Sequence, residues 1–133
     1  MAPGSGLLAQ KMKKKRPLSA IRRDLDKAFS AYIRKRDADE NGMGRCITCY
    51  RWAKLECGHF IPRQHIATRW SETNCAGQCS FCNRWQHGAQ AEFYVILVKM
   101  YGEKTVNELM ASKHKTMKFT RSQLEEMLER YRT

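Results

Sequence analysis

The sequence predicts an α+β fold, with a small zinc-stabilised core flanked by helices. Apolar residues recur at three- and four-residue steps between 18 and 39, which indicates an amphipathic helix. A short strand-like pattern follows at 45–60, and two Cys-x-x-Cys pairs lie at 46–49 and 79–82. Only 42% of the residues are hydrophobic, so the apolar core is modest and we expect a bound metal to supply part of the stability.

The N-terminal half is predicted element by element. Pro17 suits the start of a helix over Leu18–Asp39, and the turn-forming segment Asp39–Gly44 ends it. Residues 45–60 predict one β-hairpin whose turn carries the first cysteine pair. The segment 61–74 has little periodicity and predicts a loop.

The C-terminal half predicts three helices. Apolar spacing marks a helix over Phe93–Tyr101, and Gly102 ends it. A shorter helix follows around 106–110. Thr120–Gln123 has the form of a capping box, which opens a last helix with apolar residues from Leu124 to Tyr131. We also expect Trp70 and Trp85 to lie in the core.

Charge divides the chain into a flexible basic arm, residues 1–16, and a single domain, residues 17–133. The 133 residues include 25 Lys and Arg against 13 Asp and Glu, a net charge of +12. The first acidic residue is Asp24, and seven basic residues precede it. Such a segment is typical of polyanion binding, and a solvated surface is the alternative. The sequence has no apolar run long enough for a transmembrane helix and no signal peptide, so we expect a cytoplasmic protein.

Nucleic acid is the polyanion that this charge favours. The expected phosphate contacts come from the arm, the first helix, the loop after residue 60 and the segment after the second cysteine pair. They are Lys13, Lys14, Lys15, Arg16, Arg22, Arg23, Arg63, Arg69 and Arg84.

The two cysteine pairs offer four thiolates, the donor set of a closed tetrahedral zinc site with a structural role. The ligands are Cys46, Cys49, Cys79 and Cys82. A redox function for these pairs is the alternative, and disulfides would require an export signal. Cys57 and Cys75 stand outside the pairs. Cys57 is expected to be a small buried residue rather than a further zinc ligand.

Between and after the pairs lie His59, Asn74 and Asn83, a trio that can converge on one divalent metal. A neutral imidazole can take a proton from water. An amide oxygen held against the ring would fix its orientation. A metal ion would polarise a phosphate and stabilise the leaving oxygen. These residues therefore predict phosphodiester hydrolysis with the help of a divalent metal ion.

Six motifs in one order resemble the phage NinG/Rap recombination endonucleases, which belong to the HNH or ββα-metal nucleases. The similarity covers about residues 28–110. This resemblance implies an HNH-like ββα-metal core and cleavage of branched recombination intermediates, such as Holliday junctions and D-loops, with Mg²⁺ or Mn²⁺ as the catalytic ion. The motifs are Tyr32-Ile-Arg-Lys-Arg-Asp37, Cys46-Ile-Thr-Cys49, Gly58-His59-Phe60, Arg69-Trp70-Ser-Glu-Thr-Asn74, Gln78-Cys79 and Cys82-Asn83.

The resemblance assigns roles to individual residues. His59 matches the general base, Asn74 the Asn that orients this base, and Asn83 the final metal-binding position. The common pattern has Asp directly before the first His, where this chain has Gly58. Glu56 is the acidic candidate, although its odd offset from His59 places the two on opposite faces of a strand unless the strand bends.

His87, about one helical turn after Asn83, is a further candidate metal ligand, with an exposed helix residue as the alternative. The leading function is thus a DNA endonuclease. The alternatives are a zinc-stabilised junction-binding module without catalysis, or a redox or zinc-storage protein. Paired cuts in a junction imply a homodimer, with the helix Leu124–Tyr131 as one candidate interface. Host recombination proteins are further candidate partners, in the cytoplasm of the bacterial host.

Overall fold

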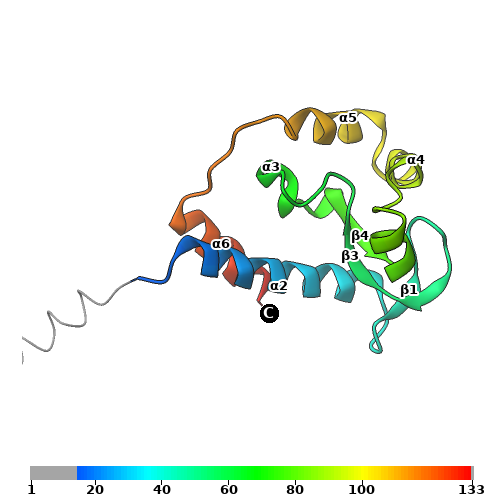
Figure 1. Ribbon diagram of the computed structural model, residues 1–133, viewed down its shortest axis with the longest axis horizontal. Coiled ribbons are helices and arrows are strands. Elements are labelled where there is room, and N and C mark those ends of the chain that lie inside the picture. Colours follow the sequence, from blue (N-terminus) through cyan, green and yellow to red (C-terminus); the bar gives the residue numbers. More distant parts are fainter. Residues whose placement is uncertain (1–14, 133) are drawn as a thin grey trace, which may run out of the picture.

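The computed structural model describes residues 15–132 and confirms an α+β architecture (Figure 1). Helices lie on both sides of two small antiparallel sheets. The elements are α2 (Leu18–Asp37), β1 (Met43–Arg45), β2 (Trp52–Lys54), β3 (Glu56–His59), α3 (Ile66–Arg69), η1 (Glu72–Asn74), β4 (Cys75–Gln78), the π-helical turn η2 (Phe81–Trp85), α4 (Gln90–Tyr101), α5 (Glu103–Ser112) and α6 (Arg121–Tyr131).

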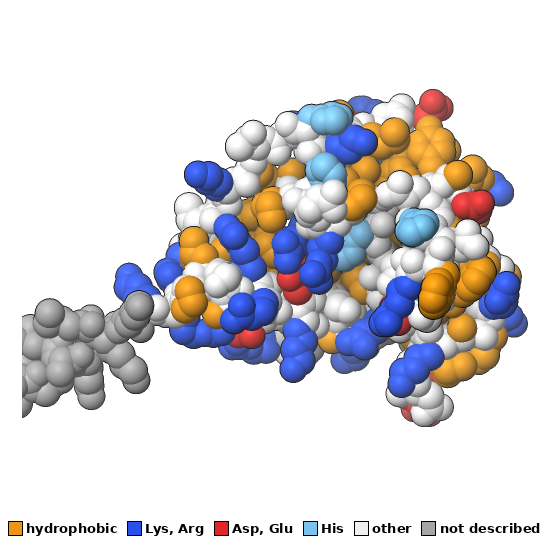
Figure 2. Space-filling view, in the orientation of Figure 1, with side chains coloured by type: hydrophobic (Ala, Val, Ile, Leu, Met, Phe, Trp, Pro, Cys, Tyr) orange, Lys and Arg blue, Asp and Glu red, His pale blue; other side chains and the backbone are white. Residues whose placement is uncertain are grey.

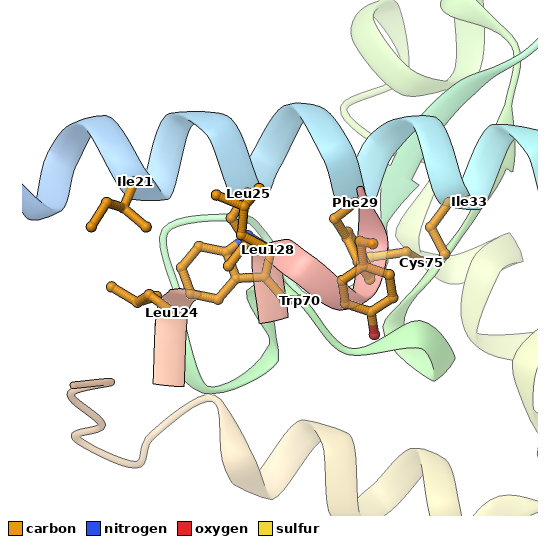
Figure 3. Packing of buried hydrophobic residues seen from close by; sticks show 9 residues of the cluster. Ile21, Leu25, Phe29, Ile33, Trp70, Cys75, Leu124 and Leu128 are labelled. Carbon is orange, nitrogen blue, oxygen red and sulfur yellow. The ribbon is translucent and has the colours of Figure 1, made fainter. Parts of the chain in front are cut away.

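The main core lies between α2 and α6, which run side by side (Figure 1). Figure 3 shows the apolar face of α2 directed at side chains from α6 and from the β4 region. Each such side chain, when fully buried, contributes about 1.5–3 kcal/mol. The apolar face of α6 packs on α2 of the same chain, so Leu124, Leu128 and Tyr131 are buried and this face is not available as the candidate dimer interface. The homodimer itself stays a prediction. The buried residues are Ile21, Leu25, Phe29, Ile33, Trp70, Cys75, Leu124, Leu128 and Tyr131.

Strand pairing differs from the single hairpin expected at 45–60. β1 pairs with β2 around the first cysteine pair, but β3 pairs with β4, so that His59 lies opposite Cys75. Two contacts with the end of α2 fix β4 in place. Asp37 accepts a hydrogen bond from the Gly77 N–H (2.8 Å), and Arg36 donates to the Cys75 carbonyl (2.8 Å).

The C-terminal helices form as expected. α4 ends before Gly102, and Thr120 opens α6 with a complete capping box. A second core packs Phe60 and Ile61 against α4 and α5. Trp70 is buried, but Trp85 is 75% exposed, so its expected core position is wrong. Among residues 15–132, no helix combines the length and the apolar character needed to cross a membrane.

Candidate functional site

The four paired cysteines come together as one cluster. The β1–β2 hairpin presents Cys46 and Cys49, and the end of β4 with η2 presents Cys79 and Cys82. Their sulfur atoms all lie within 4.8 Å of one another, and the Sγ atoms of Cys49 and Cys79 are 3.7 Å apart. Tetrahedral zinc with Zn–S bonds of about 2.3 Å separates its sulfur ligands by about 3.8 Å. The cluster therefore fits a structural zinc ion.

The protonation of Cys46 also suits a zinc ligand. Burial alone would raise the pKa of its thiol. The Thr48 hydroxyl, 3.4 Å from Sγ, and backbone N–H groups of Thr48, Cys49 and Cys79 act the other way and lower the pKa to about 6. A thiolate at this position is the form that binds metal.

A pocket of about 330 Å³ lies beside α2 and β3 and gathers several of the expected site residues. His59, Asn83 and His87 all line it, so the structure brings these three together although 28 residues separate the first from the last. The same wall includes Asp26 and Cys57.

The His59 ring is held in one tautomer. Its Nε2 lies 2.9 Å from the carbonyl oxygen of Arg69. A carbonyl only accepts hydrogen bonds, so Nε2 carries the proton. Burial lowers the pKa of His59 below its usual value, which favours the neutral ring. In a neutral ring with Nε2 protonated, the lone pair resides on Nδ1.

The sequence led us to expect the amide oxygen of Asn74 against the His59 ring, but this expectation is wrong. Asn74 is fully buried, and its Oδ1 accepts the Ile61 N–H (2.8 Å). Its Nδ2 donates to the carbonyls of Ile61 and Thr68, each at 3.1 Å. The Asn74 side chain thus connects Ile61 and Thr68, the two ends of the loop after β3. Thr68 directly precedes Arg69, whose carbonyl accepts the hydrogen bond from His59.

Asp26 on α2 is a site residue that sequence reasoning missed. It forms an ion pair with Arg69 and accepts the Trp70 indole N–H at 2.9 Å. The Arg69 side chain is only 18% exposed in this pair, so its guanidinium is engaged by a carboxylate rather than held free for the expected phosphate contact. The pair joins residues 43 positions apart, and no local sequence pattern marks such a contact.

Glu56 is directed at Asn83 rather than at His59, as strand alternation predicts. Asn83 Nδ2 donates to Glu56 Oε1 (2.9 Å), and Arg84 pairs with Glu56 Oε2 (2.8 Å). A carboxylate and an amide side by side are oxygen donors of the kind that Mg²⁺ and Mn²⁺ prefer. In this structure the Glu56 carboxylate is held by Asn83 and Arg84, and Asn83 presents its amide nitrogen to it.

Gln78 belongs to one of the six motifs, but the sequence motifs assigned no role to its side chain. It is fully buried, and its Nε2 donates to the Gly88 carbonyl (2.8 Å) and to the Thr48 hydroxyl (3.1 Å). It thereby joins the first cysteine turn to the segment that carries His87. That segment is strained, because His87 and Ala89 have φ values of 50° and 47°.

Basic side chains border the histidines on the face shown in Figure 2. Arg63 lies at the pocket edge with an exposed side chain, and Arg84 stays exposed although it pairs with Glu56. Lys15 and Arg16 line a second hollow between the start of α2 and α6. On α2, Arg23 is exposed and Arg22 is half-buried. Lys13 and Lys14 lie outside the described residues.

Searches of curated proteins and of solved structures find no match to this chain. The family described as Bacteriophage Lambda NinG protein matches residues 7–133, which is nearly the full sequence. The chain therefore belongs to the Bacteriophage Lambda NinG protein family.

Proposed function

We propose that this protein is a metal-dependent DNA endonuclease of the HNH type that acts on branched recombination intermediates. One observation carries the proposal. His59 is a half-buried imidazole with its free lone pair on Nδ1, in the same pocket as Asn83 and His87. An oriented base beside potential metal ligands is the arrangement that phosphodiester hydrolysis requires.

In the proposed reaction, His59 Nδ1 takes a proton from the attacking water. Asn74 and Asp26 act as positioning residues, because both fix the loop whose Arg69 carbonyl orients the ring. Glu56 and Asn83, with His87, would hold Mg²⁺ or Mn²⁺, and such an ion would polarise the scissile phosphate and stabilise the leaving oxygen. Arg63 and Arg84 would contact neighbouring phosphates.

Branch selectivity is proposed from the distribution of charge. The pocket has its own basic border, and Lys15 and Arg16 lie at a separate hollow near α6. Two separate basic surfaces can each engage one duplex of a branch, whereas a linear substrate would use one. A homodimer remains our expectation for paired cuts, with an interface other than the buried face of α6.

Cleavage of a labelled four-way junction with Mg²⁺ or Mn²⁺ tests this function. Removal of a general base costs about 10²–10⁴-fold in rate, so His59→Ala should lose metal-dependent cutting. Junction binding in EDTA should persist. His114→Ala is the matched control, because His114 is an exposed histidine outside the pocket and should leave the rate unchanged.

The alternative function, a junction-binding module without catalysis, predicts the opposite result. A junction-binding module would bind the four-way junction tightly and cut nothing with any divalent metal. Equal cleavage of the junction and of a linear duplex of the same sequence would retain the nuclease but refute its selectivity for branches.

A further inference from the structure

We propose that Cys57, His59 and Cys75 form a second metal site, which binds a thiophilic divalent ion such as Zn²⁺. Binding there would occupy the nitrogen that His59 uses as a base, so the ion would inhibit cleavage. The inhibitory part rests on the proposed function, whereas the site itself rests on geometry alone.

The strand register builds the site. Cys57 and His59 are two positions apart on β3 and therefore share one face of the sheet. His59 lies opposite Cys75 on β4, which brings Cys75 to the same face. One ligand atom from each of the three side chains lies within 4.8 Å of the others. Within residues 15–132, this is the one such cluster besides the four paired cysteines.

The donor set selects the metal. Two thiols and one imidazole are soft or borderline ligands, and they suit Zn²⁺ rather than Mg²⁺. A Cys₂His set leaves one of four tetrahedral positions open, as catalytic rather than structural zinc sites do. Cys57 and His59 both line the pocket, so the open position would face the place where substrate enters. The expected oxygen donors Glu56 and Asn83 lie apart from this set, because Glu56 is an odd number of positions from Cys57 and His59 on β3 and accepts a hydrogen bond from Asn83.

Zinc binding and proton abstraction would compete for the same nitrogen of the His59 ring. Nε2 donates its proton to the Arg69 carbonyl at 2.9 Å, which leaves Nδ1 as the nitrogen with a free lone pair. A metal-binding histidine usually donates the N–H of its other ring nitrogen to a carboxylate, a backbone carbonyl or water, which fixes the ring orientation. The contact that prepares the base therefore prepares a metal ligand as well.

The alternative is that both cysteines serve only as small apolar residues. Cys75 fits this description, because it is buried in the main core. Cys57 fits it less well, because it is partly exposed at the pocket wall with its thiol beside an imidazole. We therefore place the decisive substitution at Cys57.

Zinc stoichiometry by native mass spectrometry, with the full chain kept reduced, tests the site without any cleavage. The wild-type chain should bind two zinc ions. Cys57→Ser and His59→Ala should each bind one, and the ion that remains reports an intact four-cysteine cluster. His114→Ala should keep both. A wild-type chain with one zinc, or Cys57→Ser with two, would overturn the site, and Cys75→Ala provides an independent second substitution.

Competition for the ring needs its own measurement. In a long-range ¹H–¹⁵N spectrum of the histidine rings, the second zinc equivalent should shift the Nδ1 resonance of His59 and leave its Nε2–H in place. Zinc should also inhibit Mg²⁺-supported cleavage in the wild type, and inhibit Cys57→Ser at least tenfold less, each relative to its own uninhibited rate. An unshifted Nδ1 would refute the competition even if two ions bind. A shifted Nδ1 in a chain that never cuts DNA would support the site and refute only the proposed function.

Discussion

Gly58 stands where the common HNH pattern has an aspartate, and the structure gives a physical reason for glycine. A Cβ at this position would overlap the side-chain oxygen of Gln78 and lie 2.7 Å from its Cδ. Gln78 cannot easily move away, because its amide is bound to Gly88 and to Thr48. The space that an aspartate would need is thus occupied by a buried residue that supports the His87 segment. Glu56, two positions before Gly58 on β3, is a carboxylate beside Asn83, and Asp26 is the carboxylate that lines the pocket with His59.

This contact predicts a specific coupling between two residues. Gly58→Ala should destabilise the zinc-bound protein by about 1–3 kcal/mol, the usual cost of forcing an extra carbon into a packed site. The same substitution in a Gln78→Ala background should cost close to nothing, because the clashing side chain is gone. Urea unfolding of the four proteins at one zinc concentration measures the coupling. An equal cost in both backgrounds would show that Gln78 is not what requires glycine.

At the scale of elements, the four-cysteine cluster joins parts that share little other packing. The β1–β2 hairpin carries two of the sulfurs, and β4 with η2 carries the others. The apolar cluster around them has a single large member, Leu55. A metal ion bound by the four cysteines would therefore supply stability that apolar burial does not supply in this region.

Loss of this metal should unfold the chain. Structural zinc in isolated fingers contributes roughly 10–16 kcal/mol, as much as the entire stability of a typical domain. We expect Cys79→Ser, or chelation of the wild type, to abolish the cooperative thermal transition seen by circular dichroism. Ser80→Ala is the matched control, because this neighbouring side chain is exposed and makes no cap hydrogen bond. An unchanged Tm after chelation would contradict a structural role for zinc.

Elements with a strong local signal could be predicted from sequence, and those made by tertiary contacts could not. α2, α4 and α6 follow from apolar periodicity and caps, and Cys-x-x-Cys spacing indicates the zinc cluster. β4 has no such signal, because Cys-Ala-Gly-Gln is buried at all four positions and lacks β-branched residues. Its pairing with β3 depends on Asp37 and Arg36 at the end of α2. Asn74 and Asp26 are likewise bonded to the loop between β3 and β4 by tertiary contacts. The spacing of residues in the sequence does not reveal such contacts.

For the molecule as a whole, some basic side chains are held by carboxylates and backbone carbonyls, whereas others stay exposed and would be available to the proposed DNA substrate. Arg36 and Arg69 are engaged with carboxylates and backbone inside the structure. Arg63, Arg23 and Lys15 are exposed, and the arm adds further lysines before them in the sequence. The count of 25 Lys and Arg therefore overstates the number of cations that have no carboxylate or carbonyl partner within the chain.

The salt dependence of binding counts those contacts. If about five phosphates are neutralised, the slope of log K against log salt should be near −4 to −5 on duplex DNA. Replacing Lys13, Lys14 and Lys15 with Gln should make this slope less steep by about 2.7, which is 0.9 for each contact removed. Lys113, Lys115 and Lys118 lie on the connection between α5 and α6, and their replacement with Gln removes the same charge as a control. Fluorescence anisotropy on a four-way junction in EDTA, from 50 to 200 mM salt, separates the two sets. Equal slopes for both triple variants would mean that total charge, and not the arm, governs binding; an unchanged slope in the arm variant alone would remove the arm from the DNA interface.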